Sequence, residues 1–308
     1  MSFTDTFTPH SSYLFFDDEP PHYPDPSSNA HPSNAADALG DADIFADPEL
    51  HPDIRWSTWP FVEKLQRGPQ PYPVWLVTEA AALDTELGIL KTGKEADVHL
   101  IERAVPGDPH KAVQLAAKRY RSADDRAFRR DSSYTEGRKV KKSRDQRAIT
   151  NRKSEYGRAV KSGAWAWAEF SALSRLYTAG APVPYPVQID DTEILMEFIG
   201  EDGVAAPRLA QARPSAALLQ DYWHQLRTAM GVFARLGWAH GDLSPYNTLA
   251  HGDRLVIIDV PQVVDLAASP FATQFLHRDC VNMCTWFNAR GLNADPDVLF
   301  AEVLAEAW

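Results

Sequence analysis

The feature that most constrains this sequence is a polar loop at residues 240–247 (HGDLSPYN), followed by an apolar run that ends in Asp259. Apolar residues come directly before both polar elements: WA precedes the loop, and LVII precedes Asp259. Short apolar runs bounded by turn residues indicate buried strands. Polar groups that closely follow buried strands are held rigidly, so the pattern predicts an α+β domain with a fixed polar site.

Three side chains of this region meet the needs of phosphoryl transfer, which depends on positioning and charge neutralisation more than on covalent chemistry. Asp242 is a carboxylate that can orient an acceptor hydroxyl and take its proton. Asn247 and Asp259 are oxygen donors suited to Mg²⁺. The spacing from Asp242 to Asn247 equals that of the kinase H-R-D-x-x-x-x-N loop. A lone HGD would fit a solvated loop, but this combination favours a metal-assisted catalytic site.

A second set of residues precedes this loop. Lys118 stands in an apolar segment, LAAKRY, that resembles the strand carrying the phosphate-binding lysine of kinases. Glu169, in the next predicted helix, is the acidic residue available to pair with it. The glycine-rich G-x-G-x-x-G is absent, and a turn around Gly93 with Thr92 and Lys94 is the candidate phosphate loop.

The chain is predicted to have three parts. Residues 1–53 are rich in Pro, Ser, Asp and Ala, and residues 1–54 hold eleven acidic side chains and no Lys or Arg. Such a segment buries too little apolar surface to offset its ordering entropy, so a disordered acidic tail is expected. Residues 54–200 are expected to form an N-terminal lobe, and residues 201–308 a C-terminal lobe.

Within these lobes the apolar spacing predicts individual elements. They are a helical lead-in over 54–90 that runs into a strand, a strand–turn–strand around TGKEADV, a strand at 115–120, a flexible basic loop at 121–161, a helix at 165–180, a strand at 193–200, a helix at about 215–236, a strand at 255–260 and two final helices. Residues 118–161 hold sixteen Lys and Arg against six Asp and Glu. This excess favours an extended, accessible loop.

Composition narrows the remaining possibilities. The net charge of −11 belongs to the tail, and the rest of the chain is close to neutral. Two cysteines, Cys280 and Cys284, make no disulfide framework and suit a reducing cytoplasm. With His277 they could be imagined as a soft-metal site, but core packing is the favoured interpretation. The apolar runs are too short to predict a membrane span, and no signal peptide is expected.

Several motifs in order resemble the RIO family of atypical kinases, in the branch without an N-terminal winged helix. The resemblance spans about residues 85–292. It is carried by TGKEADV, AAKRY, WAWAEFSALSRL, ILMEFIG with DGVAAPRL, HGDLSPYNTL, IIDVPQVV and FLHRDCVNMCTWF. Lys91, Asp97 and Pro245 depart from the family pattern, and Lys91 replaces a serine of its phosphate loop. The short segment after Asp259 and the missing A-P-E motif fit this family better than conventional protein kinases.

The resemblance implies a two-lobed kinase-like fold with a truncated C-terminal lobe, and ATP with Mg²⁺ as cofactors. It implies that Lys94 and Val98 of the phosphate loop and Glu197 and Ile199 of the hinge contact the nucleotide, the last two through their main chain. It also implies serine autophosphorylation and, in some members, ATP hydrolysis through a phosphoaspartate, here on Asp259. Ribosome-related partners are expected on family grounds alone.

Two other functions remain open. Small-molecule phosphotransferases of the aminoglycoside or choline kinase type also carry an HGD-x-x-x-x-N loop and a strand-end Asp. A nucleotide-gated assembly factor with little kinase activity would use the basic loop to bind RNA or an acidic partner. The motifs do not specify a protein substrate.

Overall fold

The computed structural model describes residues 51–121, 155–260 and 263–307, with the backbone alone for 155–161. All of these residues belong to one compact unit. The predicted acidic tail therefore lies outside the described residues, except at its end. There the prediction was wrong, because Asp53 accepts a main-chain hydrogen bond from Glu86 N (2.8 Å) and His51 accepts one from Ile54 N (3.0 Å). The ordered chain begins before residue 54, and the predicted boundary between lobes at residue 200 stays a prediction.

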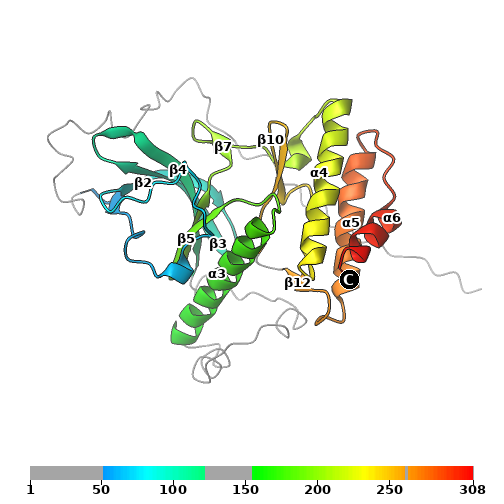
Figure 1. The fold of residues 1–308 in the computed structure, drawn as a ribbon, viewed down its shortest axis with the longest axis horizontal. Helices are drawn as coiled ribbons and strands as arrows, with labels where there is room; N and C mark the ends of the chain where they lie inside the picture. Colours follow the sequence, from blue (N-terminus) through cyan, green and yellow to red (C-terminus); the bar gives the residue numbers. More distant parts are fainter. Residues whose placement is uncertain (1–50, 122–154, 261–262, 308) are drawn as a thin grey trace, which may run out of the picture. The chain divides into compact units, whose positions relative to one another are not determined.

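A six-stranded antiparallel sheet carries the first half of the fold (Figure 1). Its spatial order is β1-β2-β3-β4-β6-β5. The strands are β1 (Ile54–Trp56), β2 (Leu83–Thr92), β3 (Ala96–Val105), β4 (Asp108–Tyr120), β5 (Pro186–Asp190) and β6 (Glu193–Glu197). The long central strands β3 and β4 both have buried residues in their middle parts. They bury Ile101, Leu115 and Ala117 in a cluster with Trp59, Tyr185 and Leu195.

Helix α3 (Glu155–Thr178) connects this sheet to the second half of the fold. Its buried residues Ala166, Phe170, Leu173 and Leu176 follow helical spacing. The first two pack on the sheet with Tyr120, Ile189 and Ile194, and the last two belong to the core of the second half. The helix ends at Thr178, and Gly180, two residues later, has a φ of 82° that suits glycine just beyond a helix terminus. One helix therefore contacts both cores and places Glu169 between them.

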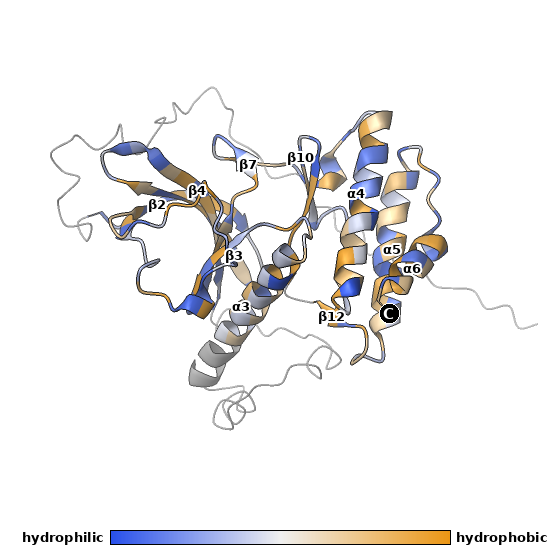
Figure 2. Cartoon of the chain, viewed as in Figure 1, coloured by the Kyte–Doolittle hydropathy of each residue, from blue (hydrophilic) through white to orange (hydrophobic). Residues whose placement is uncertain are grey.

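The second half is mainly helical, with α4 (Ala216–Arg235), α5 (Ala272–Asn288) and α6 (Pro296–Ala305). Figure 2 shows hydrophobic and hydrophilic residues alternating along α4, as expected for a helix with one face on a core. Short strands complete it: β7 (Gly200–Glu201), β8 (Val204–Ala205), β9 (Trp238–Ala239), β10 (Thr248–His251), β11 (Arg254–Ile257) and β12 (Val264–Asp265). The hairpin β10–β11 pairs Thr248 with Ile257, which brings the two polar motifs together. None of the described helices is long and apolar enough to span a membrane.

The predicted α+β fold with a sheet-bearing half and a short helical half is confirmed, but three local predictions were wrong. The lead-in over 54–90 holds one 3-10 turn, η2 (Lys64–Gln66), and no α-helix. Prolines interrupt it at 60, 69, 71 and 73, and Phe61 and Leu65 of the apolar spacing are 83% and 77% exposed. Helix α3 begins at Glu155, within the predicted basic loop. Strand β5 was not predicted, because Pro186 and the short PVQID segment give little periodicity.

Candidate active site

Lys118 lies at the centre of the candidate site. Its Nζ donates to Glu169 Oε1 at 2.7 Å and to Asp259 Oδ1 at 3.2 Å. The three residues come from β4, α3 and the segment after β11, so the contact joins the sheet to the helical half. Burial alone would lower the pKa of Lys118, but the Glu169 and Asp259 carboxylates raise it above its ordinary value. The structure thus brings together three residues that the sequence motifs predicted.

Glu169 is held on its second oxygen by Tyr120, whose hydroxyl donates to Glu169 Oε2. Burial, followed by the adjacent Glu169 charge, raises the pKa of the Tyr120 hydroxyl far above its usual range. The hydroxyl therefore stays a donor at every physiological pH. Glu169 itself is 2% exposed, and its two hydrogen bonds satisfy both oxygens of a buried carboxylate.

The polar loop presents Asp242 and Asn247 next to this ion pair. Asn247 Nδ2 donates to the Asp242 carbonyl oxygen (2.8 Å) and to Asp242 Oδ2 (3.2 Å). These bonds orient the Asn247 amide so that its Oδ1, which accepts no hydrogen bond from the described residues, is left for another ligand. The side chain of Asp242 is exposed and can meet a substrate.

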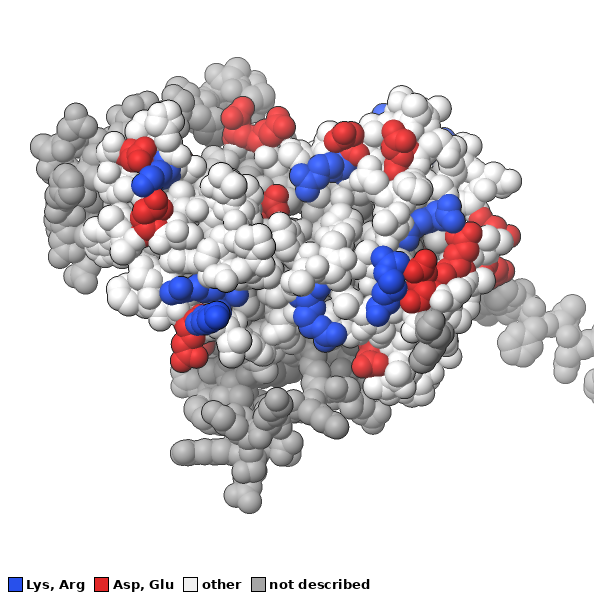
Figure 3. Space-filling view, in the orientation of Figure 1, with Lys and Arg blue, Asp and Glu red and all other residues white. Residues whose placement is uncertain are grey.

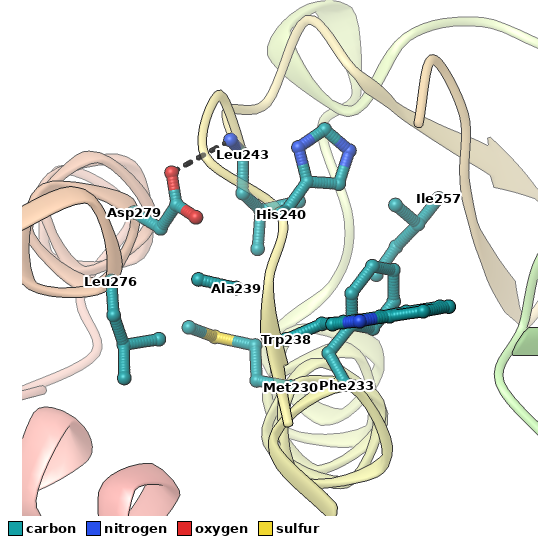
Figure 4. Close-up of a pocket in the computed structure, with 9 residues that line it drawn as sticks. All are labelled: Met230, Phe233, Trp238, Ala239, His240, Leu243, Ile257, Leu276 and Asp279. Carbon is teal, nitrogen blue, oxygen red and sulfur yellow. Dashed lines mark hydrogen bonds between the residues drawn. The ribbon is translucent and has the colours of Figure 1, made fainter. Parts of the chain in front are cut away.

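Asp279 of α5 fixes the backbone of the polar loop. Its two oxygens accept from Gly241 N and Leu243 N, each at 2.8 Å, so they grip the backbone on both sides of Asp242. Figure 4 shows the bond to Leu243 beside a small, mostly apolar cavity lined by Leu276, Ala239 and Met230. Burial raises the pKa of Asp279 to about 7, against the lowering effect of the two N–H bonds. Neighbouring α5 residues assist: the Arg278 guanidinium donates to the Gly241 carbonyl oxygen and Asn282 Nδ2 to that of Leu243.

His240 begins the loop and is 3% exposed. Its Nε2 lies 3.3 Å from the Ile258 carbonyl oxygen, and its Nδ1 accepts from Asp242 N at 3.3 Å. Burial lowers the pKa of His240, which favours the neutral ring that these two bonds require. The ring therefore links the polar loop to the segment between β11 and Asp259.

Asn247 and Asp259 form an oxygen-donor pair that fits Mg²⁺. The Asn247 carbonyl oxygen accepts from Ile258 N at 3.0 Å, so the two residues are placed next to each other by the hairpin. Asp259 adopts the left-handed backbone region (φ 63°), a strained conformation that is frequent at functional sites. Burial would raise its pKa, but Lys118 lowers it below the ordinary value and keeps the carboxylate charged. No group of three or more His, Cys, Asp or Glu in the described part of the chain is placed to bind a metal; Mg²⁺ suits such a sparse site because it usually takes its other ligands from phosphates and water.

The turn between β2 and β3 occupies the position predicted for the phosphate loop. Gly93 N donates to the Ala96 carbonyl oxygen at 3.0 Å, and a Cβ at Gly93 would lie 2.7 Å from that oxygen, so the turn requires glycine. Lys94 is exposed on this turn and has no ion pair among the residues described. Asp97 pairs with Arg121 at the end of β4 (2.6 Å), which closes the turn onto the neighbouring strand.

Val98 faces the same side of the sheet as Lys118, since the two residues are paired directly across β3 and β4. The hinge predicted around Glu197 and Ile199 follows β6. The Ile199 N–H has no hydrogen-bond partner within the described residues, whereas its carbonyl oxygen accepts from Ala206 N at 2.9 Å. Ile199 packs in a cluster with Val256 and the half-buried Leu249 and Ile258. A free N–H beside an apolar cluster is what a flat heterocycle such as adenine requires, although the nucleotide contacts themselves stay predictions.

Sequence reasoning assigned no role to Tyr120 and Asp279. Both lie within the motifs quoted above, but they act through bonds to other elements, which no spacing in the sequence reveals. Cys280 and Cys284 are buried in the helical core, and burial raises their pKa values to about 12 and about 11. The favoured interpretation as core residues is therefore confirmed. The basic loop is also predicted to carry the autophosphorylation site, at Ser132, Ser133, Ser143 or Ser154, and these four serines lie outside the described residues.

The fold and site together define a protein-kinase-like domain: a lysine on a central strand paired with a helix glutamate, a loop with Asp and Asn five residues apart, and a strand-end Asp. The RIO domain model matches residues 109–299. The RIO-type serine/threonine-protein kinase Rio1 of Haloferax volcanii is 34% identical over 234 residues, which cover 76% of this chain and 73% of that protein. The chain therefore belongs to the RIO family of atypical serine/threonine kinases.

Other relatives agree over part of their length. The serine/threonine-protein kinase rio1 of Dictyostelium discoideum is 32% identical and aligns with 67% of this chain but only 33% of its own. A crystal structure of the Rio2 kinase from Chaetomium thermophilum, an ADP/Mg²⁺-phosphoaspartate complex, superposes with a TM-score of 0.50 at 22% identity, covering 72% of this chain and 62% of that one. This likeness supports the fold. Membership of the branch without an N-terminal winged helix stays a prediction.

Proposed function

We propose that this protein is an ATP- and Mg²⁺-dependent serine/threonine kinase. The observation that carries the proposal is the bond of Lys118 to both Glu169 and Asp259 (2.7 and 3.2 Å), because this arrangement joins the phosphate-binding lysine to the metal-binding aspartate. The ADP and Mg²⁺ named for the Chaetomium Rio2 complex fit the same groups.

Each residue of the site has a defined task in this proposal. Lys118 binds the α- and β-phosphates and is oriented by Glu169. Asn247 and Asp259 hold Mg²⁺, which neutralises charge on the phosphates when bound. Asp242 accepts the proton of the acceptor hydroxyl. The oxygen of that hydroxyl bonds to the γ-phosphorus, and the bond between the γ-phosphorus and the ADP leaving group breaks. Ile199 N–H and the main chain of Glu197 receive the adenine, and Val98 covers it.

The proposed acceptor in autophosphorylation is a serine of the basic segment, at Ser132, Ser133, Ser143 or Ser154. The segment connects β4, which carries Lys118, with α3, which carries Glu169, so its ends are tied to the site. It is rich in Lys and Arg, and a phosphate would add about −1.5 to −2 charges that these side chains can pair with.

A second chemistry uses the same residues. The Asp259 carboxylate, in place of a hydroxyl, would attack the γ-phosphorus and release ADP, and water would then hydrolyse the acyl phosphate. The phosphoaspartate named for the Chaetomium structure would correspond to a product on this residue. The lowered pKa of Asp259 supports the role, since it keeps the carboxylate ionised and available as a nucleophile.

Family membership favours this proposal over an aminoglycoside or choline phosphotransferase. The assembly-factor alternative would need a surface for RNA or an acidic partner. On the face shown in Figure 3, acidic and basic side chains are interspersed, with no extended basic field among the described residues drawn there. The basic composition of the segment between β4 and α3 makes it the candidate for contact with a ribosome-related partner, as expected from the family.

The test is turnover of γ-labelled ATP by the purified protein, compared with Asp242→Asn and with Asp221→Asn, an exposed aspartate of α4, as a matched control. Acid-stable phosphoserine lost in Asp242→Asn but not in the control supports the kinase. An acid-labile label that hydroxylamine releases, with no phosphoserine, would assign hydrolysis through Asp259 as the main chemistry. Absence of any ATP turnover, or transfer to aminoglycosides in preference to protein serine, would contradict the proposal.

A further inference from the structure

Lys91, Val98 and Lys118 form a row across three adjacent strands. Lys91 of β2 is paired with Val98 of β3, which is paired with Lys118 of β4. The register of β2 shifts between Ile89 and Lys91, so a bulge brings Lys91, rather than its neighbour, into this row. Residues paired directly across antiparallel strands project from the same face of a sheet. Lys91 therefore projects from the face on which Lys118 reaches Asp259.

The charges around Lys91 agree with this placement. Burial, followed by the charge of Arg208, lowers the pKa of Lys91, while Asp259 acts in the opposite direction and Lys118 lowers it further. Two strand spacings separate Lys91 and Lys118, about 10 Å between backbones, a gap that two extended lysine side chains can span. The ammonium of Lys91 thus belongs to the charge cluster centred on Asp259.

Arg208 approaches the same cluster from the helical half. Its backbone forms an isolated bridge with Leu249 of β10, and its guanidinium donates to the Tyr246 carbonyl oxygen in the polar loop. Arg208 is thereby fixed beside the loop that carries Asp242 and Asn247, while Lys91 comes from the opposite side.

Neither of these two cations has a carboxylate partner within the described residues, whereas Lys118 has two. Two like charges near each other, neither of them paired with a carboxylate, are unfavourable. Such an arrangement is relieved when a multiply charged anion binds between the cations.

We propose that Lys91 and Arg208 bind the terminal phosphates of the nucleoside triphosphate from opposite sides, in addition to Lys118. This inference rests on the proposed function, in that ATP occupies the site. It assigns the phosphate-binding lysine of the β2–β3 region to Lys91 on the strand, where the sequence pattern had indicated Lys94 on the turn. Neither residue transfers a proton; both position the phosphate chain.

The experiment measures the dissociation constants of ATP, ADP and AMP by calorimetry for the wild type, Lys91→Met, Lys91→Arg and Arg208→Gln. Each titration is run once with EDTA and once with Mg²⁺, so that an effect acting only through the metal ligand Asp259 is recognised. Lys111→Met is the matched control, because Lys111 lies on the same sheet in an exposed pair with Glu79. We expect Lys91→Met to weaken ATP binding by about tenfold and ADP binding by less. AMP binding stays unchanged, Lys91→Arg restores most of the affinity, and Arg208→Gln reproduces the selectivity for the longer phosphate chain.

Three outcomes would overturn the inference. Unchanged ATP binding by Lys91→Met would show that the lysine does not contact phosphate. An equal loss for ATP and AMP would show a general effect on the site, and a loss seen only when Mg²⁺ is present would show that Lys91 merely neutralises Asp259. In all three cases the wild type binds ATP and the proposed function stands. A wild type that does not bind ATP at all would contradict the proposed function and this inference together.

Discussion

Glu169 shows how much a single residue decides in this site. It is the nearer partner of Lys118 (2.7 Å, against 3.2 Å for Asp259), and it also accepts from Tyr120. With Glu169 in place, Lys118 is shared between two carboxylates, and its contact with Asp259 is the longer of the two. The arrangement leaves Asp259 able to exchange its lysine contact for a metal ion.

Replacing Glu169 by Gln should therefore raise the Mg²⁺ concentration needed for half-maximal ATP turnover, by about tenfold for the loss of one charge-assisted bond. Lys118 would pair more closely with Asp259 and compete with the metal. The measurement is the Mg²⁺ dependence of turnover. The control is Glu302→Gln, because Glu302 of α6 forms an exposed ion pair with Arg227 of α4. An unchanged Mg²⁺ requirement in Glu169→Gln would argue against this competition.

Asp279 gives a pH-dependent prediction. Burial raises its folded-state pKa from an ordinary value near 4 to about 7, so the folded protein binds this proton more tightly than the unfolded chain does. The stabilisation from this group is fully present below about pH 4 and is lost as the pH rises toward 7. The difference in free energy of unfolding between the wild type and Asp279→Asn should thus shrink or reverse over that interval and level off above it.

Chemical denaturation of both proteins at pH values from about 4.5 to about 8 measures that difference. This range covers most of the titration of Asp279 and extends above it. A difference that does not vary with pH would mean that the carboxyl is ionised throughout, held by the Gly241 and Leu243 N–H groups.

At the scale of elements, a buried polar network ties the sheet together. Arg103 of β3, 0% exposed, donates to both oxygens of Asp84 on β2 (2.7 and 2.9 Å) and to Gln188 Oε1 on β5 (3.0 Å). Gln188 in turn donates to Thr58 Oγ1 at 2.7 Å. The network fixes the β2–β3 register, on which the row of Lys91, Val98 and Lys118 depends.

Asp84→Asn should destabilise the protein by about 3–5 kcal/mol, because it leaves the Arg103 guanidinium buried without its counter-charge. Urea denaturation measures the loss. Replacing both partners, as Asp84→Leu with Arg103→Met, should recover most of the stability, since two apolar side chains remove the uncompensated charge. A double variant no more stable than Asp84→Asn would show that hydrogen-bond geometry, rather than charge, accounts for the loss.

For the whole molecule, the ordered fold should begin near residue 51. Deletion of residues 1–50 should leave the melting temperature and ATP affinity unchanged, since the segment has no core-forming pattern. Deletion of residues 1–56 removes β1, with its pairing to β2 and the ion pair of Arg55 with Glu193, and should lower the melting temperature by several degrees. Thermal unfolding of the two truncated proteins makes the comparison. Equal melting temperatures for both would show that β1 adds no stability, and a lower value for the shorter deletion would show that the acidic segment does.

The sequence by itself determined the parts of the site that depend on local spacing. Asp242 and Asn247 share one loop, and Asp259 ends an apolar strand, so their relation follows from a few consecutive backbone conformations. Lys118 and Glu169 could be paired because each stands in a recognisable strand or helix. The apolar spacing of 54–90 was misleading for the same reason, since local periodicity carries no information on which side chains find a core.

Only the tertiary structure decided the contacts that cross elements. The bulge in β2 and the register with β3 and β4 bring Lys91 to the face of Lys118, and the packing of α5 brings Asp279 beneath the loop. Register and helix packing arise from the sum of many weak contacts over the whole core, and no short motif encodes that sum. Local sequence therefore determines which chemical groups the site contains, while the tertiary fold determines which charged residues surround them.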